Sequence, residues 1–118
     1  MSYVMLIYEN DKAMDTRDHP AADNADYWGA WGAYHKALQE AGVITGGGSL
    51  KGSHTGTTLR LRNGQRQVQD GPYADTKEQL GGYMVFDVPD LDTALDWASR
   101  CPAAEYGAVE VRPFHKME

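Results

Sequence analysis

The sequence predicts an α+β fold, and three observations lead to it. Two amphipathic segments of helical period, residues 23–41 and 90–101, are each preceded and followed by short β-rich runs. Asn63-Gly64 lies between two alternating runs, which is the strongest short signal for a β-hairpin. The length of 118 residues fits one domain, residues 1–118, built around a single core.

The first half of the chain is predicted to begin with a strand and a helix. Residues 3–8 are apolar on both faces, as in a buried strand. Residues 12–22 show no periodicity, so we expect a mobile loop there, which is a candidate lid. A helix then runs over residues 23–41 and ends at Gly42. The spacing of its apolar residues predicts a core-facing stripe of Tyr27, Trp31, Tyr34, Leu38 and Ala41.

Glycine runs mark the strands on either side of the hairpin. A strand that starts at Val43 enters Gly46-Gly47-Gly48, where the missing side chains predict a bulge or the close approach of another backbone. Glycines also thin the entrance to residues 83–88, which are apolar on both faces as in a central strand.

The hairpin of residues 57–70 has a register that its two-residue turn fixes. In this register Leu59 lies opposite Val68, and Leu61 and Asp70 fall on the same face as this pair. The hairpin therefore places a carboxylate at the end of an apolar surface.

The second half of the chain ends with a helix and a strand. Asp90 is predicted to cap the helix, and residues 107–114 supply the last strand. The predicted buried stripe of the helix consists of Leu91, Ala94, Leu95, Ala98 and Cys101. The order β-α-β, hairpin, β-α-β is that of a ferredoxin-like split βαβ fold with an inserted β-hairpin.

Composition excludes several classes of partner. The net charge of −6 and the isoelectric point of about 5.1 disfavour binding to nucleic acids and to anionic membranes. Cys101 stands alone, so it forms no internal disulfide, which fits a cytoplasmic location. No run approaches the length of about 18 apolar residues that predicts a membrane span.

Cofactor motifs are also missing from the sequence. The four histidines are separated by 16, 19 and 61 residues, which matches no helical metal-binding spacing. The glycine-rich segment 46–53 fits neither of the common phosphate-binding patterns. We therefore expect no metal, nucleotide or flavin cofactor.

Asp70 and Arg112 are the leading candidate site residues. Asp70 is the predicted catalytic residue, a proton acceptor, because a carboxylate on an apolar face needs a hydrogen-bonding partner or a raised pKa. The structural alternative is a turn in which the Tyr73 N–H donates to Asp70. Arg112 is the predicted anchor for an anionic ligand, and the alternative is an ion pair with Glu110 or Glu78.

We expect Asp70 and Arg112 to line one pocket in each protomer. Glu78, His54 and Tyr83 are further candidate ligand-binding residues, although a loop histidine is more often simply exposed to solvent. The seven Tyr and three Trp against two Phe favour a wet cavity or an interface over a dry core, and an aromatic-lined barrel follows from this.

Three motifs resemble those of a known family. They are Asp70-Gly71-Pro72-Tyr73, the segment Thr-Lys-Glu-Gln-Leu-Gly-Gly-Tyr over residues 76–83, and Gly-Ala-Val-Glu-Val-Arg-Pro-Phe over residues 107–114. With the second helix, they resemble the YCII-related proteins, in particular the subgroup named for its Asp-Gly-Pro-Phe (DGPF) motif, with Tyr73 in the place of Phe. The resemblance implies a ferredoxin-like protomer that forms a homodimer, a dimeric α+β barrel.

The resemblance also bears on chemistry. Some relatives are thought to use a His–Asp pair for lyase-like or isomerase-like reactions on small aromatic-derived acids. The corresponding positions here are Trp31 and Cys101, so any chemistry of this chain must use other residues.

The leading functional prediction is a small homodimeric protein that binds a small organic acid or a phenolic ligand, with isomerase-like or lyase-like proton transfer as the associated chemistry. The competing prediction is a non-enzymatic binding or regulatory module whose motifs serve the dimer fold. Whether the chain is an enzyme stays open at this stage.

Overall fold

The computed structural model describes residues 1–18, 24–74 and 76–115, and it confirms the α+β fold. Four strands form one antiparallel sheet in the order β2-β5-β1-β6. Their bounds are Ser2–Asn10 for β1, Ile44–Ser49 for β2, Glu78–Asp87 for β5 and Ala108–Pro113 for β6. With the helical crossovers β1 to β2 and β5 to β6, this strand order is the ferredoxin-like one.

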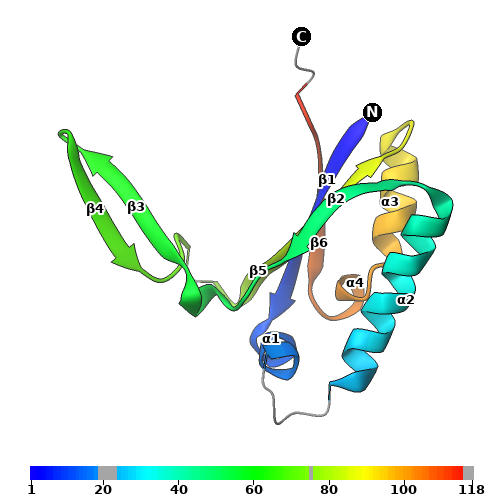
Figure 1. The fold of residues 1–118 in the computed structure, drawn as a ribbon, viewed down its shortest axis with the longest axis horizontal. Helices are drawn as coiled ribbons and strands as arrows, with labels where there is room; N and C mark the ends of the chain where they lie inside the picture. The colour runs from blue at the N-terminus through cyan, green and yellow to red at the C-terminus, as the bar shows by residue number, and fades with distance from the viewer. Residues whose placement is uncertain (19–23, 75, 116–118) are drawn as a thin grey trace.

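The helices lie on one side of the sheet (Figure 1). They are α1 (Asp11–Asp18), α2 (Ala25–Ala41), α3 (Leu91–Ser99) and α4 (Ala103–Tyr106), and a short 3-10 turn, η1, covers Ser53–Thr55. No helix among the described residues is long and apolar enough to cross a membrane.

Alternate residues of β1 form the centre of the core. Tyr3, Met5 and Ile7 are buried and pack in one cluster with residues of α2, α3 and α4. Val4, Leu6 and Tyr8 point to the opposite face of the sheet, as strand geometry requires, and stay partly exposed. We call this opposite side of the sheet the open face.

The glycine run of β2 packs closely against β5, as the sequence predicted. A register shift between Ile44 and Gly46 marks a bulge. Gly47 has a φ of +150°, and a Cβ atom there would lie 2.6 Å from the Tyr83 carbonyl oxygen. A side chain at Gly47 would therefore push the two strands apart, and glycine is required at this position.

The hairpin has the predicted register but a different environment. Strands β3 (Thr57–Arg62) and β4 (Gln65–Asp70) pair with Leu59 opposite Val68, as expected. They form a separate two-stranded sheet that projects from the body of the protein (Figure 1). The apolar face of the hairpin is consequently exposed in the protomer.

Two helical predictions need correction. The segment expected to be a loop over residues 12–22 instead begins with helix α1, which Asn10 caps by accepting a hydrogen bond from the Ala13 N–H at 2.8 Å. Residues 19–22 of that predicted loop lie outside the described residues, so the proposed lid is not described. The helix packs through Met14 and Arg17, which lie one turn apart on the same face.

The second helix also differs in part from its prediction. Asp90 caps it as expected, accepting from the Thr93 N–H at 2.8 Å. Ala94 and Ala98 are buried, whereas Leu91 and Leu95 are exposed, because the small alanines let α3 approach the sheet and turn the two leucines outward. The short helix α4 was not expected from the sequence.

Candidate functional site

A cavity of about 630 Å³ lies between α2 and the sheet. Its α2 wall is aromatic, and the rings of Tyr27 and Trp28 meet edge to face with centroids 5.0 Å apart. Its sheet wall consists of the glycine run of β2 and the middle of β5. We call this space the α2 cavity. Its volume falls in the range that accommodates a small organic ligand.

The buried carboxylate of Glu9 lies in the wall of this cavity. It continues the alternation of Tyr3, Met5 and Ile7 on β1, so it faces the helices and is only 1% exposed. Its Oε1 accepts hydrogen bonds from the hydroxyl of Tyr27, on α2, and from that of Tyr106, on α4, the latter at 3.0 Å. Three elements therefore converge on one carboxylate.

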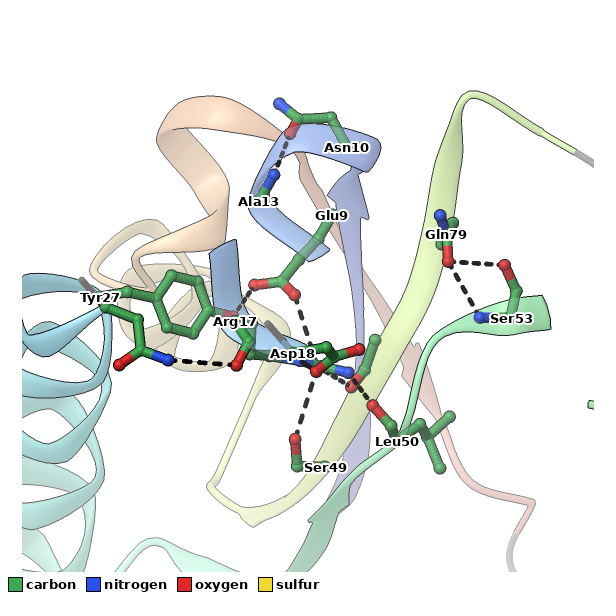
Figure 2. Close-up of polar contacts among 12 residues, drawn as sticks. Glu9, Asn10, Ala13, Arg17, Asp18, Tyr27, Ser49, Leu50, Ser53 and Gln79 are labelled. Atoms are coloured by element: carbon green, nitrogen blue, oxygen red, sulfur yellow. Dashed lines mark hydrogen bonds and ion pairs between the residues drawn. The ribbon is translucent and has the colours of Figure 1, made fainter. Parts of the chain in front are cut away.

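Arg17 holds the other side of this carboxylate (Figure 2). Its Nη1 lies 3.5 Å from Glu9 Oε2 and donates to the Gly81 carbonyl oxygen at 2.9 Å, while Nη2 donates to the Leu50 carbonyl oxygen. Its Nε donates to Asp18 Oδ1 at 2.8 Å. Through these contacts, the guanidinium connects α1 with β1, with β5 and with the segment after β2.

Burial sets the protonation of the groups around Glu9. Removal from water raises the pKa of Tyr106 to about 12, and burial followed by the Glu9 hydrogen bond raises the pKa of Tyr27 still further above its ordinary value. Burial works against the Arg17 cation, but the neighbouring Asp18 and Glu9 carboxylates more than offset it and raise the Arg17 pKa. At neutral pH the two phenols are donors and Arg17 is charged.

Glu9 Oε2 can accept a hydrogen bond from a ligand. The contact to Glu9 Oε2 among the described residues is the long one to Arg17, so this oxygen keeps room for another donor. Glu9 and Arg17 are the charged residues in the cavity wall, and the described hydrogen bonds of Arg17 go to protein groups. The cavity can therefore accept a hydrogen bond from a ligand, while the Arg17 guanidinium is already bound by protein groups; His35 is the other basic side chain in the described wall.

A metal role finds no support in the arrangement of side chains. In residues 1–18, 24–74 and 76–115, no three His, Cys, Asp or Glu side chains gather as a metal site requires.

The five residues singled out from the sequence lie in different places. Tyr83 lies on the strand that borders the α2 cavity, but its side chain shares the open face with that of its β1 partner Leu6, whereas Asp70, Arg112, Glu78 and His54 do not border the cavity. These four are exposed, at the end of β4, on β6, at the start of β5 and in η1, respectively.

Asp70 and Arg112 belong to different sheets in the protomer. Arg112 forms an ion pair with Glu110, which is one of the alternatives considered for it from the sequence. A shared pocket for Asp70 and Arg112 stays a prediction.

Sequence reasoning missed both charged residues of the cavity. Glu9 carried a usable signal, since it extends the period-two pattern of residues 3, 5 and 7 and so belongs on their buried face. Arg17 carried none, because it lies in a polar segment that resembled a loop.

Comparison with known proteins agrees with this fold. The model of the YCII-related domain family matches residues 1–118. The chain belongs to the YCII-related domain family. An uncharacterised protein of Rhizobium meliloti strain 1021 is 40% identical to this YCII-related chain over 83 residues, which cover 69% of the chain and 67% of that relative.

One solved structure has a similar fold. It is 5-chloro-2-hydroxyhydroquinone dehydrochlorinase (TftG) from Burkholderia phenoliruptrix AC1100, in complex with 2,5-dihydroxybenzoquinone. The similarity covers 98% of this YCII-related chain and 94% of TftG, with a TM-score of 0.56 and 16% identity. At this identity the likeness concerns the fold alone.

Proposed function

We propose that this YCII-related protein binds a small phenolic compound in the α2 cavity, as a cytoplasmic homodimer of the DGPF subgroup. The observation that carries the proposal is the buried carboxylate of Glu9 in the wall of an aromatic cavity. A carboxylate removed from water needs donors, and a ligand hydroxyl supplies one. The aromatic wall formed by Tyr27, Trp28 and Trp31 suits a flat ring.

The charges of the cavity favour a phenol over an organic acid. A ligand carboxylate would approach Glu9 with like charge, and the described hydrogen bonds of Arg17 go to Glu9, Asp18, the Ser49 hydroxyl and backbone carbonyls. A neutral hydroxyl donates to Glu9 Oε2 without that repulsion. We therefore narrow the two ligand classes expected from the sequence to the phenolic one.

A second line of support comes from the neighbour of known structure. TftG is a dehydrochlorinase of a chlorinated hydroxyhydroquinone, and its structure contains 2,5-dihydroxybenzoquinone, a hydroxylated ring. A ligand of the same general class is consistent with the aromatic lining and the buried acceptor of the α2 cavity.

Glu9 also supplies a route for acid–base chemistry. The proton of a ligand hydroxyl passes to Glu9 Oε2, which leaves a phenolate and a carboxylic acid. Return of that proton to a ring carbon gives the keto tautomer, an isomerase-like step that needs no other reactant.

A non-enzymatic binding module is the second candidate, and a specific observation favours it. Glu9 already has three partners, and the positions where some relatives are thought to carry a His–Asp pair hold Trp31 and Cys101. Burial raises the pKa of the Cys101 thiol to about 11, so this group transfers no proton at neutral pH. Nuclear magnetic resonance of a bound phenol in deuterated water separates the candidates, since exchange of ring protons accompanies the isomerase-like step alone.

Calorimetric titration tests the binding proposal. We expect hydroquinone and catechol to bind with a Kd at least about tenfold lower than that of benzoate, since a hydrogen bond to a charged group contributes about 1.5–3 kcal/mol. Glu9→Gln should remove this preference. Equal binding of benzoate, or an unchanged preference in Glu9→Gln, would contradict the proposal.

A second variant protects this test from a folding defect. Trp28 lies in the cavity wall and is already 43% exposed, so Trp28→Ala should keep the fold while weakening the binding of every ring probe. The matched control is Tyr73→Ala, which removes an exposed ring outside the α2 cavity and should leave binding unchanged.

A further inference from the structure

We propose that the hairpin β3–β4 is an arm that packs its apolar face against a second copy of this chain. The proposal rests on the homodimer part of the proposed function and is independent of the ligand. It concerns the surface formed by Leu59, Leu61 and Val68, which we call the arm face.

The arm face is exposed and has no counterpart in its own protomer. Leu59, Leu61 and Val68 are 49%, 61% and 58% exposed, and all three lie on one side of the hairpin. The two strands form their own sheet and extend away from the body (Figure 1). The radius of gyration of 16.1 Å exceeds the roughly 13–14 Å of a compact domain of this length.

The base of the hairpin is closed by contacts between its two ends. The Gly71 N–H donates to the Gly56 carbonyl oxygen at 2.8 Å, and the Thr58 hydroxyl donates to the Gly71 carbonyl oxygen at 2.9 Å. The guanidinium carbon of Arg60 lies 5.0 Å from the centre of the Tyr73 ring. Because Arg60 points to the side opposite Leu59, Tyr73 covers the polar side and leaves the arm face free.

A free arm of this kind is not stable by itself. An isolated two-stranded hairpin is at best marginally stable in water and needs a packing surface. Exposed apolar side chains gathered on one side mark a surface that another molecule covers. The arm face therefore requires a partner.

Charge identifies a second copy as that partner. Arg60, Arg62, Arg66 and Asp70 give the hairpin a net charge of +2, so the rest of a chain with a net charge of −6 carries −8. The body of a second copy attracts this basic arm, whereas the total charge disfavours a nucleic acid. Two arms that each pack on the other protomer make a closed twofold contact, which uses the same surfaces twice.

Sedimentation velocity over a dilution series tests the arm with charge-matched variants. The first replaces two arm-face residues, Leu61→Asp with Val68→Asp. The control places the same charges on the opposite side of the hairpin, Gln65→Asp with Gln67→Asp. All four side chains are exposed in the protomer, so neither variant disturbs the core.

We expect the arm-face variant to raise the Kd of the dimer at least about 100-fold, since each buried apolar side chain contributes about tenfold or more. The control should raise the Kd by less than about tenfold, and high salt should remove this smaller effect. In the wild-type protein, backbone amides of residues 57–70 should gain protection from hydrogen exchange as the concentration passes through the Kd.

Each other outcome has a definite meaning. If the wild-type protein is a dimer and both variants leave its Kd unchanged, the arm proposal is overturned while the homodimer stands. The arm face is then covered by a different protein. Equal effects of the two variants also overturn the arm proposal, because charge alone would explain them. A monomeric wild-type protein overturns both the arm and the homodimer, while the ligand titrations decide the α2 cavity separately.

Discussion

At the scale of single residues, Glu9 and Arg17 are the charged pair in the wall of the α2 cavity. Both are nearly removed from water, and the side chain of Arg17 is 4% exposed. Such a pair is stable in the interior because every charge has partners: two phenols for Glu9, and Asp18 with two backbone carbonyls for Arg17. The pair positions α1 against β1 and β5.

Arg17→Met tests the structural part of this role. The change leaves Glu9 buried without its cation and frees two carbonyl oxygens, so we expect the free energy of unfolding to fall by about 3 kcal/mol. Arg62→Met, at an exposed position of the hairpin, should change it by no more than about 0.5 kcal/mol. Denaturation with urea measures both, and equal losses would show that the Glu9–Arg17 pair adds no stability.

The raised pKa values of the phenol and thiol groups predict a loss of stability at alkaline pH. The pKa of Tyr106 rises from 10.0 to about 12 on folding, so the unfolded chain loses this proton first. Stability linked to Tyr106 is therefore fully present below pH of about 10 and is lost as the pH rises toward about 12. Burial raises the pKa of Cys101 from 9.0 to about 11, which adds a similar loss from a pH of about 9.

Urea midpoints measured from pH of about 8 to 11 check this dependence. The midpoint should fall across the range, and Tyr106→Phe should flatten the fall because it removes one of the titrating groups. A constant midpoint in the wild-type protein would contradict the raised pKa values of these groups.

At the scale of secondary structure, local pattern predicted most elements but not the helices α1 and α4. The stripe of α2 and the turn of the hairpin are local signals. The turn was predicted correctly, and so was the burial of Tyr34 and Leu38, whereas Ala41 at the end of the predicted stripe is exposed. Residues 12–18 are mostly polar and show no apolar period, so α1 depends on the Asn10 cap and on the contacts of Arg17. The cavity was missed for the same reason, because half of its charged pair lies in that helix.

The register of the hairpin could be predicted from the sequence, but its environment could not. Its register follows from Asn63-Gly64, a two-residue turn, but which sheet it joins depends on contacts distant in sequence. Asp70 was therefore placed on the correct face of the hairpin, while that face proved to be exposed in the protomer.

The glycine run of β2 provides a test at this scale. Gly47→Ala places a methyl group against the Tyr83 carbonyl at a strained φ, and we expect a loss of about 2 kcal/mol or more. Gly46→Ala is the matched control, because its nearest atoms are 3.9 Å away on the Val85 side chain. Thermal unfolding should separate the two variants by several degrees, and equal melting temperatures would refute the close approach of β2 and β5.

At the scale of the whole molecule, the protomer leaves two apolar surfaces uncovered. One is the open face of the sheet, where Leu80 and Tyr83 are 39% and 40% exposed, and the other is the arm face. One twofold interface can cover both, which is why we propose a homodimer.

Light scattering at micromolar concentration tests this assembly. We expect a mass twice the 13.0 kDa of one chain. Val85 lies on the open face of β5 and is half-buried, so Val85→Asp should shift the protein toward the monomer. A wild-type mass equal to that of one chain would exclude the homodimer.

The location of a bound phenol tests the central claim most directly. A crystal structure of the protein with the phenolic probe that binds best in the titrations should show its ring between α2 and the sheet, with a hydroxyl within about 3 Å of Glu9 Oε2. A ring bound elsewhere, such as beside Asp70 or Arg112, or a hydroxyl turned away from Glu9, would contradict the account.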